Sequence, residues 1–334
     1  MAGSSSSGGG PAESGDGPGT DGPTHLLDVD DLDPAAVESL LDAAEAYRAA
    51  REAGEPHRDL PGAQVAMLFE QPSTRTRVSF ETGTNHLGGD AVFLGPGETQ
   101  LARGEPVKDT ARALSGYVDA VVARVASHAT VEELAAYASV PVVNALTDRA
   151  HPCQALADLL TLRDVAGSLS ETSVTWVGDG NNVAASFALA CAAAGVDLTV
   201  ATPPGHGLDD DIVARAAALG SAPTVATDPT TAVAGADAVY TDVWVSMSDD
   251  GVDRAAFAPF RVDEDLLAAA PDAAVMHCLP AHRGEEITDA VIEGERSVVF
   301  RQAENRLHVQ KALLVALCGD GSARSVDRAP DEPS

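Results

Sequence analysis

The sequence is poor in lysine, aromatic residues and long apolar runs, and each shortage excludes a class of protein. Lys108 and Lys311 are its two lysines, and 21 Lys and Arg stand against 51 Asp and Glu, for a formal net charge of -30 at pH 7. A broad basic face for nucleic acid or an anionic membrane is therefore excluded. The chain has no run of about 18 apolar residues, so we expect no membrane span.

Cysteine is also scarce, and its placement bears on the compartment. The four cysteines are scattered and show no disulfide framework, which favours a reducing cytoplasm; they are Cys153, Cys191, Cys278 and Cys318. Residues 1–24 are rich in Gly, Ser and Pro and lack the basic and apolar regions of a secretory signal. We expect this segment, and the acidic segment 321–334, to be disordered tails.

The excess of carboxylates is itself informative. An acidic, lysine-poor surface suits a cytosol of very high salt, where the Debye length falls to about 3 Å and self-repulsion is screened. GC-rich codon bias would explain the missing lysines but not the surplus of Asp and Glu. We therefore favour a halophilic source.

The order of apolar segments predicts an α/β protein with two domains, each a mainly parallel sheet flanked by helices. A chain of 334 residues with 45% hydrophobic residues is long enough for two cores. Short apolar runs alternate with helical patterns in both halves. The expected strands are Val65–Phe69, Ala91–Leu94, Ala120–Ala123, Pro141–Val143, Ser173–Val177, Asp197–Ala201, Ala238–Thr241 and Ala274–His277.

Helical patterns give the expected boundaries. Pro34–Arg51 is an amphipathic pattern that begins at Pro34, with Asp33 as its N-cap. We expect a first domain over 25–150, a bridging helix over 151–164 and a second domain over 165–302. A strand Ser297–Phe300 and then a helix over 303–320 that packs back on the first domain complete the prediction.

The motif Ser73-Thr74-Arg75-Thr76-Arg77 follows the first expected strand. A strand that leads through hydroxyl side chains into a helix presents free backbone N–H groups and the positive end of the helix dipole. Arginine adds a planar fork that matches phosphate oxygens. In a chain so acidic, this cluster indicates a local phosphate site.

The segment Gly178-Asp179-Gly180-Asn181-Asn182 also lies between a strand and a helix, like a dinucleotide-binding loop. Its third glycine position holds Val183, and no acidic residue closes the next strand, which disfavours a nicotinamide dehydrogenase. We interpret it as a tight turn at the carboxyl edge of the sheet, where Asn181 and Asn182 offer amides to a carboxylate. A metal site built from His151, Cys153, His277 and Cys278 lacks the spacing of a closed zinc shell.

Seven segments together resemble the ornithine carbamoyltransferases of the aspartate/ornithine carbamoyltransferase superfamily, from about His25 to Leu317. The Ser-Thr-Arg-Thr-Arg and His-Pro-x-Gln motifs are shared with aspartate-specific relatives, whereas the His-Cys-Leu-Pro and Ser-Met motifs select ornithine. The segments are Phe69–Arg77, Gly104–Arg112, His151–Asp158, Gly178–Asn182, Asp242–Met247, His277–Pro280 and Ala303–Arg306. Two positions depart from the pattern: Ser248 replaces a usual glycine and Gln71 a common lysine.

The resemblance implies transfer of the carbamoyl group of carbamoyl phosphate to the side-chain amine of L-ornithine, giving L-citrulline and phosphate. It implies no metal or organic cofactor and a homotrimer or a multiple of trimers. Its implied catalytic residues are Cys278, Arg124 and His151. Its implied carbamoyl phosphate ligands are Ser73, Thr74, Arg75, Thr76, Gln100 from a neighbouring subunit, Arg124, His151, Gln154, Cys278, Leu279 and Arg306. Its implied ornithine ligands are Asn182, Asp242, Ser246 and Met247.

Two alternatives remain open at this point. A sister enzyme acting on another amine, such as putrescine, would not need a site for an α-carboxylate. A non-catalytic paralogue that binds phosphate or an amino acid would not need the full catalytic set. The role of Cys278 is also open, because a thiolate there would accept the amine proton whereas a thiol would orient the amine.

Overall fold

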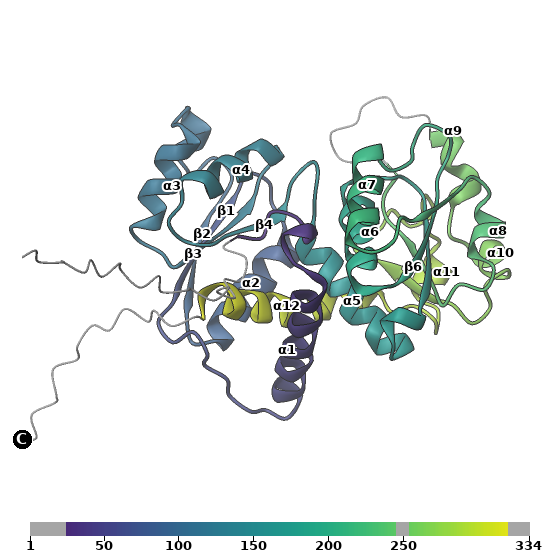
Figure 1. Cartoon of the computed structure of the whole chain (residues 1–334), viewed down its shortest axis with the longest axis horizontal. Coiled ribbons are helices and arrows are strands. Elements are labelled where there is room, and N and C mark those ends of the chain that lie inside the picture. Colours follow the sequence, from purple (N-terminus) through teal and green to yellow (C-terminus); the bar gives the residue numbers. More distant parts are fainter. Residues whose placement is uncertain (1–24, 245–253, 320–334) are drawn as a thin grey trace, which may run out of the picture.

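The computed structural model describes residues 25–244 and 254–319 (Figure 1). The expected tails at 1–24 and 321–334 lie outside the described residues. So do Ser246, Met247 and Ser248.

The first domain contains a four-stranded parallel sheet in the order β2-β1-β3-β4. Its central strands are buried on both faces, as expected for apolar strands covered by crossover helices. The strands are β1 (Gln64–Phe69), β2 (Asp90–Leu94), β3 (Ala120–Arg124) and β4 (Val142–Leu146). The helices between them are α2 (Thr74–His86), α3 (Val107–Ser115) and α4 (His128–Tyr137), with the 3-10 helix η2 (Leu101–Arg103) before α3.

The second domain contains a five-stranded parallel sheet in the order β7-β6-β5-β8-β9, so the predicted fold class is confirmed. Its strands are β5 (Ser173–Val177), β6 (Asp197–Ala201), β7 (Thr224–Ala226), β8 (Ala238–Thr241) and β9 (Ala274–His277). Its helices are α6 (Asn182–Ala194), α7 (Asp210–Leu219), α8 (Pro229–Val233), α9 (Arg254–Phe257), α10 (Glu264–Leu267) and α11 (Asp289–Ile292), with η3 (Leu169–Glu171) and η4 (Ala258–Phe260).

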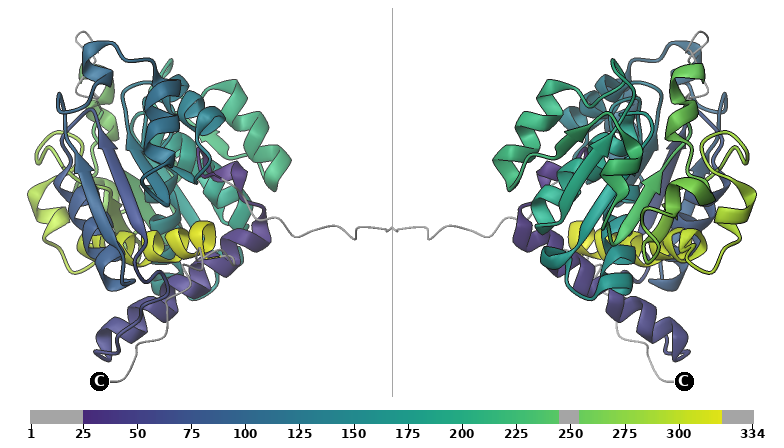
Figure 2. Two further views of the ribbon diagram at one scale, coloured as in Figure 1. Left: turned by 90° about the vertical axis from the view of Figure 1, so that its left-hand side faces the viewer. Right: turned by 90° about the vertical axis from the view of Figure 1, so that its right-hand side faces the viewer.

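Three long helices connect the domains. In α1 (Pro34–Glu52) the Asp33 side chain accepts from the Ala36 N–H at 2.7 Å, which confirms the predicted cap. The bridging helix α5 (Pro152–Ala166) is buried from Pro152 through Leu162, between the two sheets. The last helix, α12 (Val299–Cys318), packs against α1, α2 and α5 and crosses beneath the first sheet (Figure 2).

The predicted strand Ser297–Phe300 is wrong, because α12 already begins at Val299. Ser297 forms an isolated bridge to Val275, and the Phe300 side chain is 62% exposed. A run of four residues does not distinguish a strand from the first turn of a helix.

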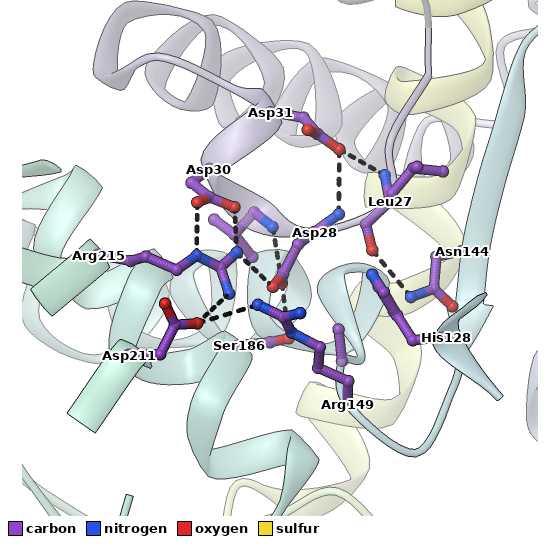
Figure 3. Close-up of polar contacts among 12 residues, drawn as sticks. Leu27, Asp28, Asp30, Asp31, His128, Asn144, Arg149, Ser186, Asp211 and Arg215 are labelled. Carbon is purple, nitrogen blue, oxygen red and sulfur yellow. Dashed lines mark hydrogen bonds and ion pairs between the residues drawn. The ribbon is translucent and has the colours of Figure 1, made fainter. Parts of the chain in front are cut away.

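An N-terminal strap, residues 25–32 with the 3-10 helix η1 (Val29–Asp31), touches both domains (Figure 3). Leu26 pairs with β4, donating its N–H to the Val142 carbonyl at 2.9 Å. On the other side, the Arg215 guanidinium of α7 donates to Asp28 at 2.7 Å and to Asp30 at 2.5 and 2.8 Å. The strap thus joins the edge of one sheet to a helix of the other domain.

Candidate active site

The phosphate motif forms the beginning of α2. Ser73 caps this helix: its Oγ accepts from the Thr76 N–H at 3.3 Å and donates to the Thr76 Oγ1 at 3.0 Å. The predicted order of strand, hydroxyl turn and helix is confirmed, and it leaves free backbone N–H groups at the start of α2. Thr74 is exposed and Arg75 is half-buried at this end.

The two arginines of the motif have different surroundings. Arg77 pairs with Glu81 at 3.0 Å, and its guanidinium lies 3.8 Å from the centre of the Phe93 ring. Arg75 makes no ion pair with a described residue, and its charge acts on Arg124, His151 and Arg306. Of the two, Arg75 is therefore the one available to an anion.

Arg306 joins three helices at this point. From α12 it donates to the Thr76 Oγ1 at 2.8 Å and to the Gln154 Oε1 of α5 at 3.1 Å. The three side chains are buried, and Arg306 is separated from Thr76 by 230 residues in sequence. The structure thus brings together three of the predicted carbamoyl phosphate ligands.

Arg124 ends β3 and His151 precedes α5, beside this cluster. Burial, followed by the charges of Arg306 and Arg75, lowers the pKa of Arg124 to about 10. Burial and the same arginines hold the pKa of His151 well below its usual value. The Arg124 Nε, Arg306 Nε and His151 Nδ1 are buried and have no hydrogen-bond partner among residues 25–244 and 254–319. Arg75, Arg124 and Arg306 repel one another and form no ion pair with a described residue, which marks a site for an anion.

Cys278 follows β9, and its neighbourhood is acidic. The Cys278 Sγ donates to the Asp242 Oδ1 at 3.0 Å, and the Asn181 Nδ2 donates to the Asp242 Oδ2 at 3.0 Å. Burial, and then the Asp242 carboxylate, raise the pKa of the Cys278 thiol well above its usual value. In this arrangement Cys278 is a thiol, which favours orientation of the amine over acceptance of its proton.

The two asparagines at the start of α6 have separate partners. The Asn181 Oδ1 caps α6 by accepting from the Val183 and Ala184 N–H groups, each at 3.0 Å, while its amide faces Asp242. The Asn182 Nδ2 donates to the Thr147 carbonyl at 2.6 Å. In this structure the Asn181 and Asn182 amides both have partners within the protein, and their binding of a substrate carboxylate stays a prediction.

The backbone after Cys278 is sharply turned. Leu279 has a φ of 60°, in the left-handed region that a β-carbon disfavours, and it precedes a cis peptide bond to Pro280. Its N–H donates to the His277 Nδ1 at 2.8 Å. The His277 Nε2 therefore carries the proton and donates to the Glu286 Oε1 at 3.1 Å.

Gln100 lies apart from the other predicted ligands. It is exposed, immediately before η2, and its Oε1 accepts from Arg103 at 3.5 Å. Among the described residues, no contact links Gln100 to the cluster around Arg306 in the same chain.

One group near the site has the composition of a metal centre. Ligand atoms of Asp242, His277 and Cys278 lie within 4.8 Å of one another. Both His277 nitrogens are occupied by Leu279 and Glu286, and the Cys278 thiol already donates to Asp242. The group is therefore satisfied by its own hydrogen bonds.

The prediction of individual site residues omitted Asp158. Its carboxylate accepts from Gln154 of α5, Gln302 of α12 and Tyr240 of β8, at 2.7–2.9 Å. The available signal was its spacing of four residues from Gln154, which places both side chains on one face of a helix. Its partner Gln302 is 144 residues away and gave no local signal.

Two parallel-sheet domains with an anion site beside a thiol are the arrangement of a transferase that acts on a phosphorylated donor. Family models match nearly the whole described chain: aspartate/ornithine carbamoyltransferase, carbamoyl-P binding domain, over residues 24–164, and the Asp/Orn binding domain over residues 170–317. The chain belongs to the aspartate/ornithine carbamoyltransferase family.

Its similar relatives are named more narrowly. An ornithine carbamoyltransferase of Haloquadratum walsbyi is 52% identical over 300 residues, covering 89% of this chain and 98% of the relative. One of Methanoculleus marisnigri is 53% identical over 307 residues, covering 90% and 99%. The solved ornithine carbamoyltransferase from Pyrococcus furiosus has a TM-score of 0.86 at 47% identity, covering 89% and 98%.

A separate observation concerns membranes. Among residues 25–244 and 254–319, no helix combines the length and apolarity needed to cross a bilayer.

Proposed function

We propose that the protein is an ornithine carbamoyltransferase, which transfers the carbamoyl group of carbamoyl phosphate to the side-chain amine of L-ornithine. The observation that carries the proposal is the cluster of Arg75, Arg124 and Arg306, which have no ion pair with a described residue and lie beside a thiol and a carboxylate. Such a cluster suits a phosphorylated substrate, and the neighbouring Asp242 suits an ammonium group. The relatives at about 50% identity carry the same activity in their names.

The phosphate end of the substrate would be held by Ser73, Thr74, Arg75 and Thr76. The amine nitrogen attacks the carbamoyl carbon, a C–N bond forms, and the C–O bond to phosphate breaks. The amine gives up one proton, which the departing phosphate accepts. Positive groups fixed in advance around the reacting oxygens stabilise the charge that develops on them.

The carbamoyl carbonyl would be polarised by Arg124, His151 and Gln154. Because burial and the neighbouring arginines lower the pKa of His151, its imidazole is neutral at neutral pH and would act as a hydrogen-bond donor. Arg306 would contribute its charge while held by Thr76 and Gln154. Neutral His151 adds a donor without adding a further repelling charge to the cluster.

Ornithine would bind on the side of Cys278. We assign its α-ammonium and carboxylate to Asp242 and Asn182, together with Ser246 and Met247 outside the described residues. A Cys278 thiol already bonded to Asp242 would orient the side-chain amine. The backbone of Leu279 would complete the carbamoyl side of the pocket.

The activity is tested by measuring carbamoylated product with ornithine, putrescine and aspartate as competing acceptors. We expect citrulline from ornithine and carbamoyl phosphate as the main product. Greater activity with putrescine or aspartate would reject the proposal.

The phosphate assignment has a matched pair of variants in one motif. Arg75→Ala should lower kcat/KM for carbamoyl phosphate by a factor on the order of 100 or more, since losing one partner of a buried charged contact costs roughly 2–5 kcal/mol. Arg77→Ala should keep kcat/KM near the wild-type value, because Arg77 pairs with Glu81 and Phe93. Equal losses in the two variants would reject the assignment of Arg75.

We also propose a cytoplasmic homotrimer of arginine metabolism, adapted to high salt, in which Gln100 completes the site of a neighbouring subunit. The exposed position of Gln100 and the net charge of -30 support this. In dilute buffer the Debye length grows from about 3 Å at 1 M to about 30 Å at 0.01 M, so carboxylates repel across subunit contacts. Sedimentation and activity over a salt series at fixed pH should show a trimer in molar salt that dissociates and loses activity in dilute buffer. An active trimer in dilute buffer would refute the salt adaptation, and an active monomer would refute the shared site.

A further inference from the structure

Asp158 is fully buried in the middle of α5, where elements of both domains meet. Its Oδ1 accepts from the Gln154 Nε2 at 2.8 Å and from the Gln302 Nε2 at 2.7 Å. Its Oδ2 accepts from the Tyr240 hydroxyl at 2.9 Å. It forms no ion pair with a described residue, so these three donors are what satisfies the carboxylate.

These contacts determine which way both glutamine amides face. Each glutamine turns its NH2 group to Asp158, so its carbonyl oxygen must face the opposite side. The Gln154 Oε1 accepts from Arg306 at 3.1 Å, and the Gln302 Oε1 accepts from the His277 N–H at 2.9 Å. If either amide were reversed, its NH2 group would meet another N–H donor and two buried groups would lose their partners.

The two arms lead to different groups of assigned substrate ligands. Gln154 and Arg306 belong to the cationic cluster, and Arg306 continues to Thr76 at the phosphate loop. The His277 N–H lies one residue before Cys278, next to Asp242. The Asp158 carboxylate therefore contacts both Gln154, on the carbamoyl phosphate side, and Gln302, which holds the backbone on the ornithine side.

We propose that Asp158 is a positioning residue for carbamoyl transfer, which orients Gln154 toward Arg306 and, through Gln302, fixes the backbone that carries Cys278. The proposal rests on the proposed function. Asp158 lies behind the assigned substrate ligands and acts through the two glutamines.

The electrostatics of the position agree with a role other than packing. Burial raises the pKa of Asp158 to about 7, although all three hydrogen bonds favour the carboxylate. A buried ionisable group of this kind is costly, and an apolar side chain of similar volume is often neutral or stabilising in its place. Burial alone therefore does not explain an aspartate at this position, whereas the need to orient the amides of Gln154 and Gln302 does.

The test compares Asp158→Leu with the conservative Asp158→Asn. Leucine removes the acceptor from both glutamines, and we expect kcat to fall about 100-fold, the order of loss that small misplacements cause. Asparagine keeps an acceptor toward the glutamines if its NH2 group faces Tyr240, whose hydroxyl then accepts. We expect this variant to keep most of the wild-type kcat.

Asp164→Asn is the matched control, because Asp164 lies on the same helix and contacts α12 through Asn305 at 3.0 Å but reaches no site residue. Its kcat and both KM values should stay at the wild-type level. Folding of each variant is checked by circular dichroism and thermal melting. An Asp158→Leu protein that is folded and keeps full kcat would overturn the proposal, as would equal losses in Asp158→Leu and Asp158→Asn.

Gln302→Leu cuts one arm only and serves if Asp158→Leu fails to fold. It should raise the KM for ornithine more than the KM for carbamoyl phosphate, because the phosphate ligands lie on the Gln154 arm, whereas a general structural defect would change both alike. If the wild-type protein formed no citrulline, the proposed function would fail. Carbamoyl phosphate binding, measured by calorimetry, would then decide the role of Asp158: Asp158→Leu should weaken it and Asp164→Asn should not.

Discussion

The two domains are joined in two chemically different ways, each centred on an aspartate. In the α5–α12 seam, Asp158 accepts from two amides and a phenol and has no ion pair with a described residue. In the N-terminal strap, Asp28 accepts from the Ser186 hydroxyl at 3.1 Å and the Arg215 guanidinium at 2.7 Å. The donors to Asp158 are uncharged, whereas the donors to Asp28 include a guanidinium.

Exposure separates the two connections further. The seam residues Gln302 and Asn305 are fully buried. In the strap the Arg215 side chain is 20% exposed, and the neighbouring Arg149–Asp211 pair is 47% and 63% exposed (Figure 3). Solvent ions reach the strap but not Asp158, so salt should act on the strap while pH should act most strongly at Asp158.

The largest expected effect is on the pH dependence of stability in Asp158→Asn. Folding raises the pKa of Asp158 from 3.8 to about 7. The contribution of Asp158 to the free energy of unfolding is therefore full below pH 3.8 and is lost as the pH rises through about 7. Each pKa unit corresponds to about 1.4 kcal/mol. Urea unfolding at several pH values from 4 to 8 in high salt should show the wild-type protein losing stability relative to Asp158→Asn. Parallel profiles would contradict the assignment of this shift to Asp158.

A smaller loss of stability is expected for a substitution between α5 and α12 that lies away from the active site. Asn305→Leu removes a donor to the Thr161 hydroxyl and to the Asp164 carboxylate, each at 3.0 Å, and an acceptor from Arg48 at 3.1 Å. The free energy of unfolding should fall by about 1–3 kcal/mol, the cost of leaving buried polar groups unpaired. The loss should be the same at 0.5 M and 2 M salt, and a loss that shrinks with salt would contradict the buried character of the seam.

The smallest effect is expected in the strap. Arg215→Met leaves Asp28 and Asp30 without their guanidinium and should lower the free energy of unfolding by about 1 kcal/mol, less at high salt. Arg149→Met is the control, since this exposed pair with Asp211 should change stability by under about 0.5 kcal/mol. If both variants lost equal stability at every salt concentration, the strap would not act through its ion pairs.

The fold was predictable where the signal was local. The Asp33 cap, the apolar central strands and the hydroxyl turn at Ser73 depend on neighbours within a few residues, and each is confirmed. The edge strand β7 was missed because it has three residues and its Val225 is 63% exposed, which leaves no apolar pattern. Short segments at a sheet edge carry little periodicity.

The site divides in the same manner. Motifs identified the strand ends that face the site, and the structure places Thr76, Gln154 and Arg306 in direct contact. The residues that orient them were not predictable, because the bond of Asp158 to Gln302 depends on how two distant helices align. The ionisation of Cys278 was equally hidden, since Asp242 reaches it from another strand. The orientation of the ligands and the ionisation of Cys278 depend on contacts between elements distant in sequence, which residue types alone do not indicate.

The position of α12 has a consequence for the order in which the chain is completed on the ribosome. This helix supplies Val309, Leu313 and Leu314 to the core that also contains Val37 and Leu41 of α1. The apolar face of α1 is made within the first fifth of synthesis, yet its cover is among the last segments to emerge. At about 5–20 residues per second, that face waits more than ten seconds for its partner. The core of the first domain to be translated is therefore completed only when the last helix has been made.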